Sequence, residues 1–177
     1  MDAEHFLSMD LSLDLGNGQD GSTAQTAPKE PQILIYHTHS QETFSDYPEN
    51  PEATITGVGA YLSELLEGKG YSVIHDDGVY DYRDGKLDRS RAYTYALEGI
   101  QGILQKYPSI EVVLDIHRDG VGNSTRLVNE VNGKTTAQVM FFNGTSQTPD
   151  GPISYLENPN REDNLAFSFQ MKLCADA

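Results

Sequence analysis

The sequence predicts an α/β protein with a three-layer fold: a mainly parallel sheet, helices on both faces and an antiparallel hairpin near the C-terminus. Three short apolar runs, at 33–37, 71–75 and 112–117, are typical of strands buried on both faces. Two segments with apolar residues at helical spacing, 55–69 and 89–106, lie between these runs. Strands that alternate with helices of this length indicate parallel pairing through right-handed crossovers.

The two predicted helices carry signals at their ends. Thr54 can cap the first helix and Gly70 lies just past its end, while Asp88 or Ser90 can cap the second. Each helix has an apolar stripe that we expect to face the sheet. The stripes predict six buried side chains: Val58, Leu62, Leu65, Leu97, Ile100 and Leu104.

The pattern changes after the third strand. Residues 126–131 and 135–142 are strand-like and flank Asn132-Gly133, a pair that favours a type I′ hairpin. A final amphipathic helix is predicted at 161–174, with Leu165, Phe169 and Leu173 on one face. Residues 1 to about 31 are polar and acidic, so we interpret them as a flexible, dispensable lead to one domain at 32–177.

The composition excludes several classes of function. The chain has 27 acidic and 12 basic residues and a formal net charge of −15, which argues against electrostatic binding to nucleic acid or anionic lipid. Its one cysteine, Cys174, permits no intrachain disulfide. No apolar run approaches the ~18 residues of a membrane span. The acidic start is unlike a signal peptide, so we expect no export or anchoring signal in this chain.

Candidate metal ligands follow two of the predicted strands. His39 and Glu42, spaced H-x-x-E, come directly after the first strand, and His117 ends the third. In open α/β sheets, sites form at the carboxyl ends of the strands. Two imidazoles and a carboxylate suit Zn²⁺ and leave one coordination position for a water that the metal would activate.

Other polar residues near these strand ends have more than one interpretation. His37 lies two residues from His39, so both would point to one face of an extended strand. It is an alternative ligand or a substrate contact. His75 is interpreted as structural, and Asp115 is better placed to orient His117 than to meet substrate. Each histidine taken alone is also compatible with an ordinary hydrogen-bonded residue at a strand end.

At these residues the chain resembles the stage II sporulation protein P family. The resemblance covers residues 32–175 in order and is carried by ILIYHTHSQE, VGAYLSELLEGKGYSVIHD, VVLDIHRDG, AQVMFFNGT and NPNREDNLAFSFQMKL. That family is related to the type 3 N-acetylmuramoyl-L-alanine amidases. The resemblance therefore implies zinc-dependent hydrolysis of the bond between N-acetylmuramic acid and the L-alanine of the peptidoglycan stem peptide. It also implies action outside the membrane during engulfment of the forespore, with a sporulation lytic transglycosylase as a partner.

Carried onto this chain, the resemblance implies Zn²⁺ held by His39, Glu42 and His117, with Arg118 and Asp119 beside the site as substrate contacts. It leaves the stretch that contains Asn160, Arg161 and Asn164 without a role.

Family members begin with a membrane anchor and continue past residue 177. There a further strand carries the glutamate that resembles the acid/base of the related amidases. No residue of this chain matches that glutamate, so we expect a fragment that binds zinc but hydrolyses the wall slowly. If it is active by itself, Asp119 is the expected proton acceptor. The alternatives are a wall-binding domain without activity and a zinc carboxypeptidase, in which H-x-x-E and a later histidine also occur.

Overall fold

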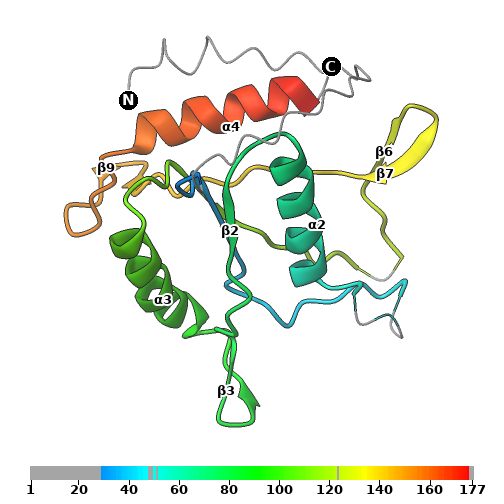
Figure 1. Cartoon of the computed structure of the whole chain (residues 1–177), viewed down its shortest axis with the longest axis horizontal. Coiled ribbons are helices and arrows are strands. Elements are labelled where there is room, and N and C mark those ends of the chain that lie inside the picture. Colours follow the sequence, from blue (N-terminus) through cyan, green and yellow to red (C-terminus); the bar gives the residue numbers. More distant parts are fainter. Residues whose placement is uncertain (1–28, 48–49, 51, 123, 176–177) are drawn as a thin grey trace. The chain divides into compact units, whose positions relative to one another are not determined.

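The computed structural model describes residues 29–47, 50, 52–122 and 124–175, and these form two compact units divided between Val121 and Gly122. The first unit holds a parallel sheet and two helices, and the second holds two hairpins and the last helix (Figure 1). The predicted flexible lead lies outside the described residues as far as residue 28. Lys29, where the description begins, is already tied to the first unit, because its ammonium group donates to the carbonyl of Gly70 at 2.6 Å.

The sheet consists of β1 (Ile33–Tyr36), β2 (Val73–His75) and β5 (Val112–Asp115), paired in parallel in the order β2-β1-β5. In the central strand, Ile35 pairs with His75 on one side and with Leu114 on the other. All three strands therefore end at one edge of the sheet. This parallel core confirms the predicted α/β class.

Helix α2 (Ile55–Gly68) connects β1 to β2, and helix α3 (Ala92–Lys106) lies between β2 and β5 in the chain. Figure 1 shows the two helices on opposite sides of the sheet. None of the described helices is long and apolar enough to cross a membrane.

The ends of α2 follow the predicted signals, whereas neither Asp88 nor Ser90 is the N-cap of α3: that residue is Arg91, and no side chain caps the helix. The hydroxyl of Thr54 accepts the N–H of Gly57 at 3.1 Å and so caps α2. Gly70 follows the helix with a φ of +89°, which glycine adopts without strain. At α3 the carboxylate of Asp88 accepts the N–H of Arg91, the residue before the helix, at 3.2 Å.

The faces that the helices bury differ from the prediction. Val58, Leu65 and Leu97 are 43%, 47% and 56% exposed, Leu62 and Leu104 are half-buried, and of the six predicted positions only Ile100 is buried. The buried stripes lie at steps of four residues and consist mainly of small side chains: Ile55, Gly59 and Ser63 in α2, and Ala92, Ala96 and Ile100 in α3.

The reason for the small stripe is visible at Gly59. A Cβ at this position would lie 2.4 Å from Nε2 of His37 and 2.8 Å from Nε2 of His75. Two imidazoles that lie between helix and sheet leave no room for a larger residue. Apolar spacing cannot reveal such a face, because glycine and serine carry no hydrophobic signal.

A small hairpin of the first unit lies between β2 and α3 in the chain. It consists of β3 (Tyr82–Arg83) and β4 (Lys86–Leu87), whose four residues are all exposed. The hairpin is closed at its base by a backbone hydrogen bond of 2.7 Å from Asp88 to Asp81. Asp81 itself is fully buried, which becomes important for the site.

The second unit contains β6 (Val128–Val131), β7 (Lys134–Ala137), β8 (Gln147–Thr148), β9 (Gly151–Pro152) and α4 (Arg161–Ala175). β6 and β7 form the predicted hairpin, and positive φ angles of 52° at Asn132 and 74° at Gly133 match a type I′ turn. The predicted helix at 161–174 is also confirmed. Its expected apolar face is largely exposed among the described residues: Leu165 41%, Phe169 63% and Leu173 53%.

Candidate functional site

The turn that follows β1 carries the first candidate ligands. Residues 38–41 form a turn closed by a hydrogen bond of 3.1 Å from the N–H of Glu42 to the carbonyl of His39. Thr38 and Ser40 are buried and point into the protein, where each bonds a carboxylate. The turn that carries His39 and Glu42 is thus held by the hydrogen bonds of Thr38 and Ser40.

Asp115, at the end of β5, anchors Thr38 and His117 together. Its carboxylate accepts the backbone N–H of Thr38 at 2.9 Å and the Thr38 hydroxyl at 2.6 Å. Its Oδ2 also lies 2.9 Å from Nε2 of His117. Asp115 therefore makes the contact with His117 that its predicted orienting role requires.

The electrostatics of this pair follow from the contact. The hydrogen bond to Asp115 raises the pKa of His117 above its usual value, and the nearby Glu42 carboxylate adds to the effect. Burial alone would raise the pKa of Asp115, but its hydrogen bonds from His117 and Thr38 outweigh burial and lower that pKa. The two groups therefore favour a charged pair in the metal-free protein.

His39 and His117 meet at the edge of the sheet. Their ring centroids are 5.3 Å apart, with planes inclined by 70°. The Nδ1 atom of His39 is buried and has no hydrogen-bond partner within the described part of the chain. An unpaired imidazole nitrogen beside a second imidazole is a feature that a bound cation would satisfy.

Tyr93, at the start of α3, lies against both histidines. Its ring centroid is 5.3 Å from that of His39 and 6.4 Å from that of His117. The ring is 60% exposed, so it forms part of the open edge. The position of Tyr93 beside the two histidines was not predicted. No signal in the sequence separates it from the other tyrosines.

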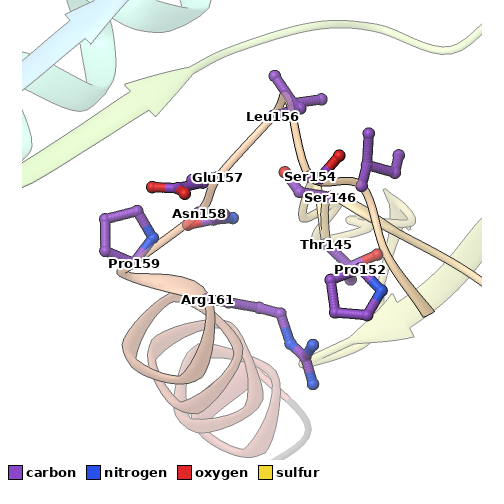
Figure 2. Close-up of a pocket in the computed structure, with 10 residues that line it drawn as sticks. Thr145, Ser146, Pro152, Ser154, Leu156, Glu157, Asn158, Pro159 and Arg161 are labelled. Atoms are coloured by element: carbon purple, nitrogen blue, oxygen red, sulfur yellow. The ribbon is translucent and has the colours of Figure 1, made fainter.

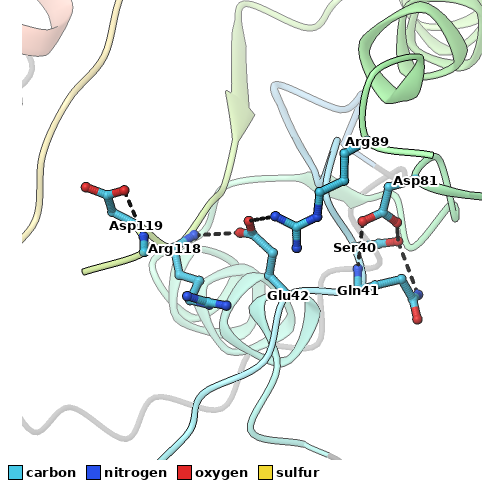
Figure 3. A network of polar contacts seen from close by, with 8 residues as sticks. Ser40, Gln41, Glu42, Asp81, Arg89, Arg118 and Asp119 are labelled. Carbon is cyan, nitrogen blue, oxygen red and sulfur yellow. Dashed lines mark hydrogen bonds and ion pairs between the residues drawn. The ribbon is translucent and has the colours of Figure 1, made fainter. Parts of the chain in front are cut away.

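Glu42 is buried and paired on both carboxylate oxygens. Oε2 accepts the backbone N–H of Arg118 at 3.0 Å, and Oε1 lies 3.5 Å from the guanidinium of Arg89 (Figure 3). Arg89 follows the base of the β3–β4 hairpin and is partly exposed. Its contact with Glu42 joins segments 47 residues apart and was not predicted.

His37 does not share a face with His39. It is fully buried, with Nδ1 3.2 Å from the carbonyl oxygen of Ile116 and Nε2 2.9 Å from Nε2 of His75. The strand ends at Tyr36, so the alternation that would have aligned the two histidines stops before they are reached. This placement argues against His37 as a ligand or substrate contact, and the pairing with His75 supports a structural role for both.

Arg118 and Asp119, the other predicted substrate contacts, follow His117 directly. Nε of Arg118 is buried and lacks a hydrogen-bond partner among the residues described. Asp119 is exposed, and its carboxylate accepts the N–H of Gly120 at 2.8 Å. Figure 3 shows the two residues extending from the same segment beside Glu42.

The three predicted ligands are of donor types that suit zinc, but their side chains do not converge on one point. Residues 29–47, 50, 52–122 and 124–175 contain no group of three or more His, Cys, Asp or Glu side chains that could hold a metal ion as they stand. His39 and His117 are neighbours, whereas Glu42 is engaged by Arg118 and Arg89. A carboxylate has further lone pairs, so these contacts leave Glu42 able to accept a metal bond.

A separate pocket of 430 Å³ lies within the second unit, beside the β8–β9 hairpin and the start of α4 (Figure 2). Its lining includes Ser146, Glu157, Asn158 and Arg161. The guanidinium of Arg161 donates to the side-chain oxygen of Gln147. Of Asn160, Arg161 and Asn164, to which the resemblance assigns no role, Arg161 lines this pocket, and none of the predicted site residues does.

The fold and the polar edge define the chain as an α/β protein with a site rich in histidine and carboxylate groups at the carboxyl end of its parallel sheet. The profile of the stage II sporulation protein P family matches residues 7–177. The chain belongs to this family of sporulation proteins, as the HTHSQE and DIHRDG motifs predicted.

One relative is the stage II sporulation protein P of Bacillus subtilis (strain 168), to which the chain is 24% identical over 139 residues. The match covers 72% of this chain and 34% of the relative, so the chain spans about a third of that protein's length. No solved structure matches the chain significantly.

Proposed function

We propose that this chain supplies the metal-binding part of a zinc-dependent N-acetylmuramoyl-L-alanine amidase that acts on peptidoglycan during engulfment. The observation that carries the proposal is the approach of His39 and His117, from the ends of two parallel strands, with Glu42 buried in the same turn. The donor types of these residues support zinc as the metal, and the resemblance to the family supports both zinc and peptidoglycan as the substrate.

In this proposal His39, Glu42 and His117 hold Zn²⁺, which supplies an activated water and polarises the scissile carbonyl. Asp115 fixes the ring of His117 through Nε2, which leaves Nδ1 as its donor to the metal. Holding the ring by a carboxylate also makes the imidazole a stronger ligand. The contacts of Arg118 and Arg89 with Glu42 limit the motion of the carboxylate.

The substrate would meet the site along the open edge formed by Tyr93, Arg118 and Asp119. Tyr93 offers an exposed ring face beside both histidines, which suits the apolar face of a sugar. Arg118 offers a cation for the carboxylates of a stem peptide. Asp119 is an exposed carboxylate that can exchange protons with solvent and substrate.

The test is to incubate purified peptidoglycan with the protein and Zn²⁺ and to identify the released products. An amidase frees whole stem peptides with a new amino-terminal L-alanine, which labelling of free amines detects. Chelation of the metal and His117→Ala should both abolish this release. Lys134→Ala, an exposed change in the β6–β7 hairpin of the other unit, should not affect it.

A second candidate function is a wall-binding domain without hydrolysis. It is favoured by the engagement of both Glu42 oxygens and by the lack of a preformed three-ligand cluster in the described segments. Sedimentation of the protein with wall fragments, without any released product, would support this candidate. Release of single terminal residues would instead identify a carboxypeptidase and overturn the amidase proposal.

A further inference from the structure

We propose that Asp81 is a positioning residue of the candidate zinc site, because its buried carboxylate fixes the turn that presents His39 and Glu42. The zinc part of this inference rests on the proposed function. Asp81 lies between β2 and the β3–β4 hairpin, 39 positions after Glu42 and 36 positions before His117.

The burial of Asp81 needs a cause. Its side chain is fully buried, although the β3–β4 hairpin that follows it is exposed. A carboxylate taken from water costs several kcal/mol unless hydrogen bonds compensate. The hairpin does not require the carboxylate, because its base is closed by the backbone bond from Asp88 to the Asp81 carbonyl.

The partners of the carboxylate lie in the H-x-x-E turn. Oδ1 of Asp81 accepts the hydroxyl of Ser40 at 3.0 Å, and Oδ2 accepts the backbone N–H of Gln41 at 3.3 Å (Figure 3). Ser40 and Gln41 are the two residues between His39 and Glu42. The carboxylate therefore holds the middle of the segment whose ends are the candidate ligands.

Asp81 is the second of two carboxylates that hold this turn. Asp115 holds Thr38, immediately before His39, and Asp81 holds Ser40, immediately after it. The backbone of His39 is thus fixed on both sides. Because His39 Nδ1 has no partner among the described residues, the direction of its ring depends on this backbone and on its ring neighbours.

The same hairpin base reaches the other candidate ligand. Arg89 follows Asp88 in the chain and places its guanidinium 3.5 Å from Oε1 of Glu42. This pair is partly exposed and contributes little by itself. Together with Asp81 it shows that the base of the hairpin contacts the turn at three successive residues, 40–42.

The test compares Asp81→Asn with Asp76→Asn in the full chain. Asp76 is a matched control: it precedes the same hairpin, and its carboxylate accepts the hydroxyl of Tyr80 at 2.5 Å and the N–H of Gly78 at 3.4 Å, both within its own loop. Zinc affinity is measured by competition with a chromophoric chelator. We expect Asp81→Asn to weaken Zn²⁺ binding by about 10–100-fold, as is typical for groups that orient ligands, and Asp76→Asn to change it less than about 3-fold.

A second measurement separates positioning from loss of fold and does not need the metal. Amide hydrogen exchange in chelator should become about 10-fold faster at Gln41 and Glu42 in Asp81→Asn, relative to amides of the central sheet, and should stay unchanged in Asp76→Asn. Ser40→Ala should accelerate exchange less than Asp81→Asn does, and it should add little to the effect of Asp81→Asn, because both changes act on the hydrogen bond between Ser40 and Asp81.

The outcomes discriminate between the two proposals. Equal loss of zinc affinity in both variants, or unchanged exchange in the turn, would overturn the role of Asp81. If the wild-type chain binds no zinc but the turn loosens only in Asp81→Asn, the proposed function fails while the positioning of the turn by Asp81 stands.

Discussion

Removing the carboxylate of Asp115 should destabilise the metal-free protein strongly. Asp115→Ala deletes two hydrogen bonds from the fully buried Thr38 and one from His117. Hydrogen bonds to charged groups contribute about 1.5–3 kcal/mol each, and they are not additive. The Asp115 side chain is 20% exposed, so water replaces part of the loss. We therefore expect a decrease of about 3 kcal/mol in the free energy of unfolding.

The assay is chemical and thermal unfolding in chelator, with Asp119→Ala as the control. Asp119 is an exposed aspartate four positions later, and its loss should change stability by less than about 0.5 kcal/mol. For a chain of 177 residues, about 3 kcal/mol corresponds to a decrease in Tm of about 6–12 °C. A decrease equal to that of the control would refute the idea that Asp115 joins β1 to β5.

The pH dependence of this effect has a definite sign. The lowered pKa of Asp115 stabilises the fold above the usual carboxylate value near 4, and this is lost as pH falls through the folded pKa. The raised pKa of His117 stabilises the fold below its usual value near 6.5, and this is lost as pH rises through the folded pKa. The difference between wild type and Asp115→Ala should thus be largest at about pH 5–6 and smaller at about pH 9.

Two further predictions concern the packing beneath the site. In urea unfolding, Gly59→Ala should destabilise the protein by about 1–3 kcal/mol, because the new Cβ would overlap His37 and His75. The control is Gly68→Ala in the same helix, where a Cβ meets nothing within 4 Å, and this change should be neutral or stabilising. Burial, and to a lesser extent the neighbouring His75, lower the pKa of His37 despite its bond to the Ile116 carbonyl. NMR titration in chelator should therefore show its midpoint below pH 6.5, and the protein should lose stability as pH falls below that value. A His37 that protonates near pH 6.5 would contradict the buried arrangement.

The fold could be predicted because its signals are local. The strands at β1, β2 and β5 are short apolar runs, Thr54 caps a helix, and Asn132-Gly133 specifies a hairpin turn. The buried helix faces could not be predicted in this way. Gly59 packs against two buried imidazoles, and only the folded structure brings those groups together.

The candidate site was predicted in part for the same reason. His39, Glu42 and His117 stand directly after strands, so the topology alone places them at one edge. The groups that hold them come from other segments. Asp81 and Arg89 contact the turn from positions 40 or more residues away in the chain, and no short sequence motif predicts such contacts. The shared face expected for His37 and His39 is not observed, because β1 ends at Tyr36 and strand alternation stops there.

Zinc stoichiometry decides whether His39, Glu42 and His117 form a metal site in this chain. The chain should be purified, loaded with Zn²⁺, dialysed and analysed by mass spectrometry for metal per protein, beside His39→Ala, Glu42→Gln and His117→Ala. We expect close to one zinc per wild-type chain and a loss of bound zinc in each of these variants. His37→Gln, if it folds, should retain zinc, because His37 is buried away from the site. A wild-type chain without zinc, or a chain that keeps zinc after His117→Ala, would contradict this ligand set.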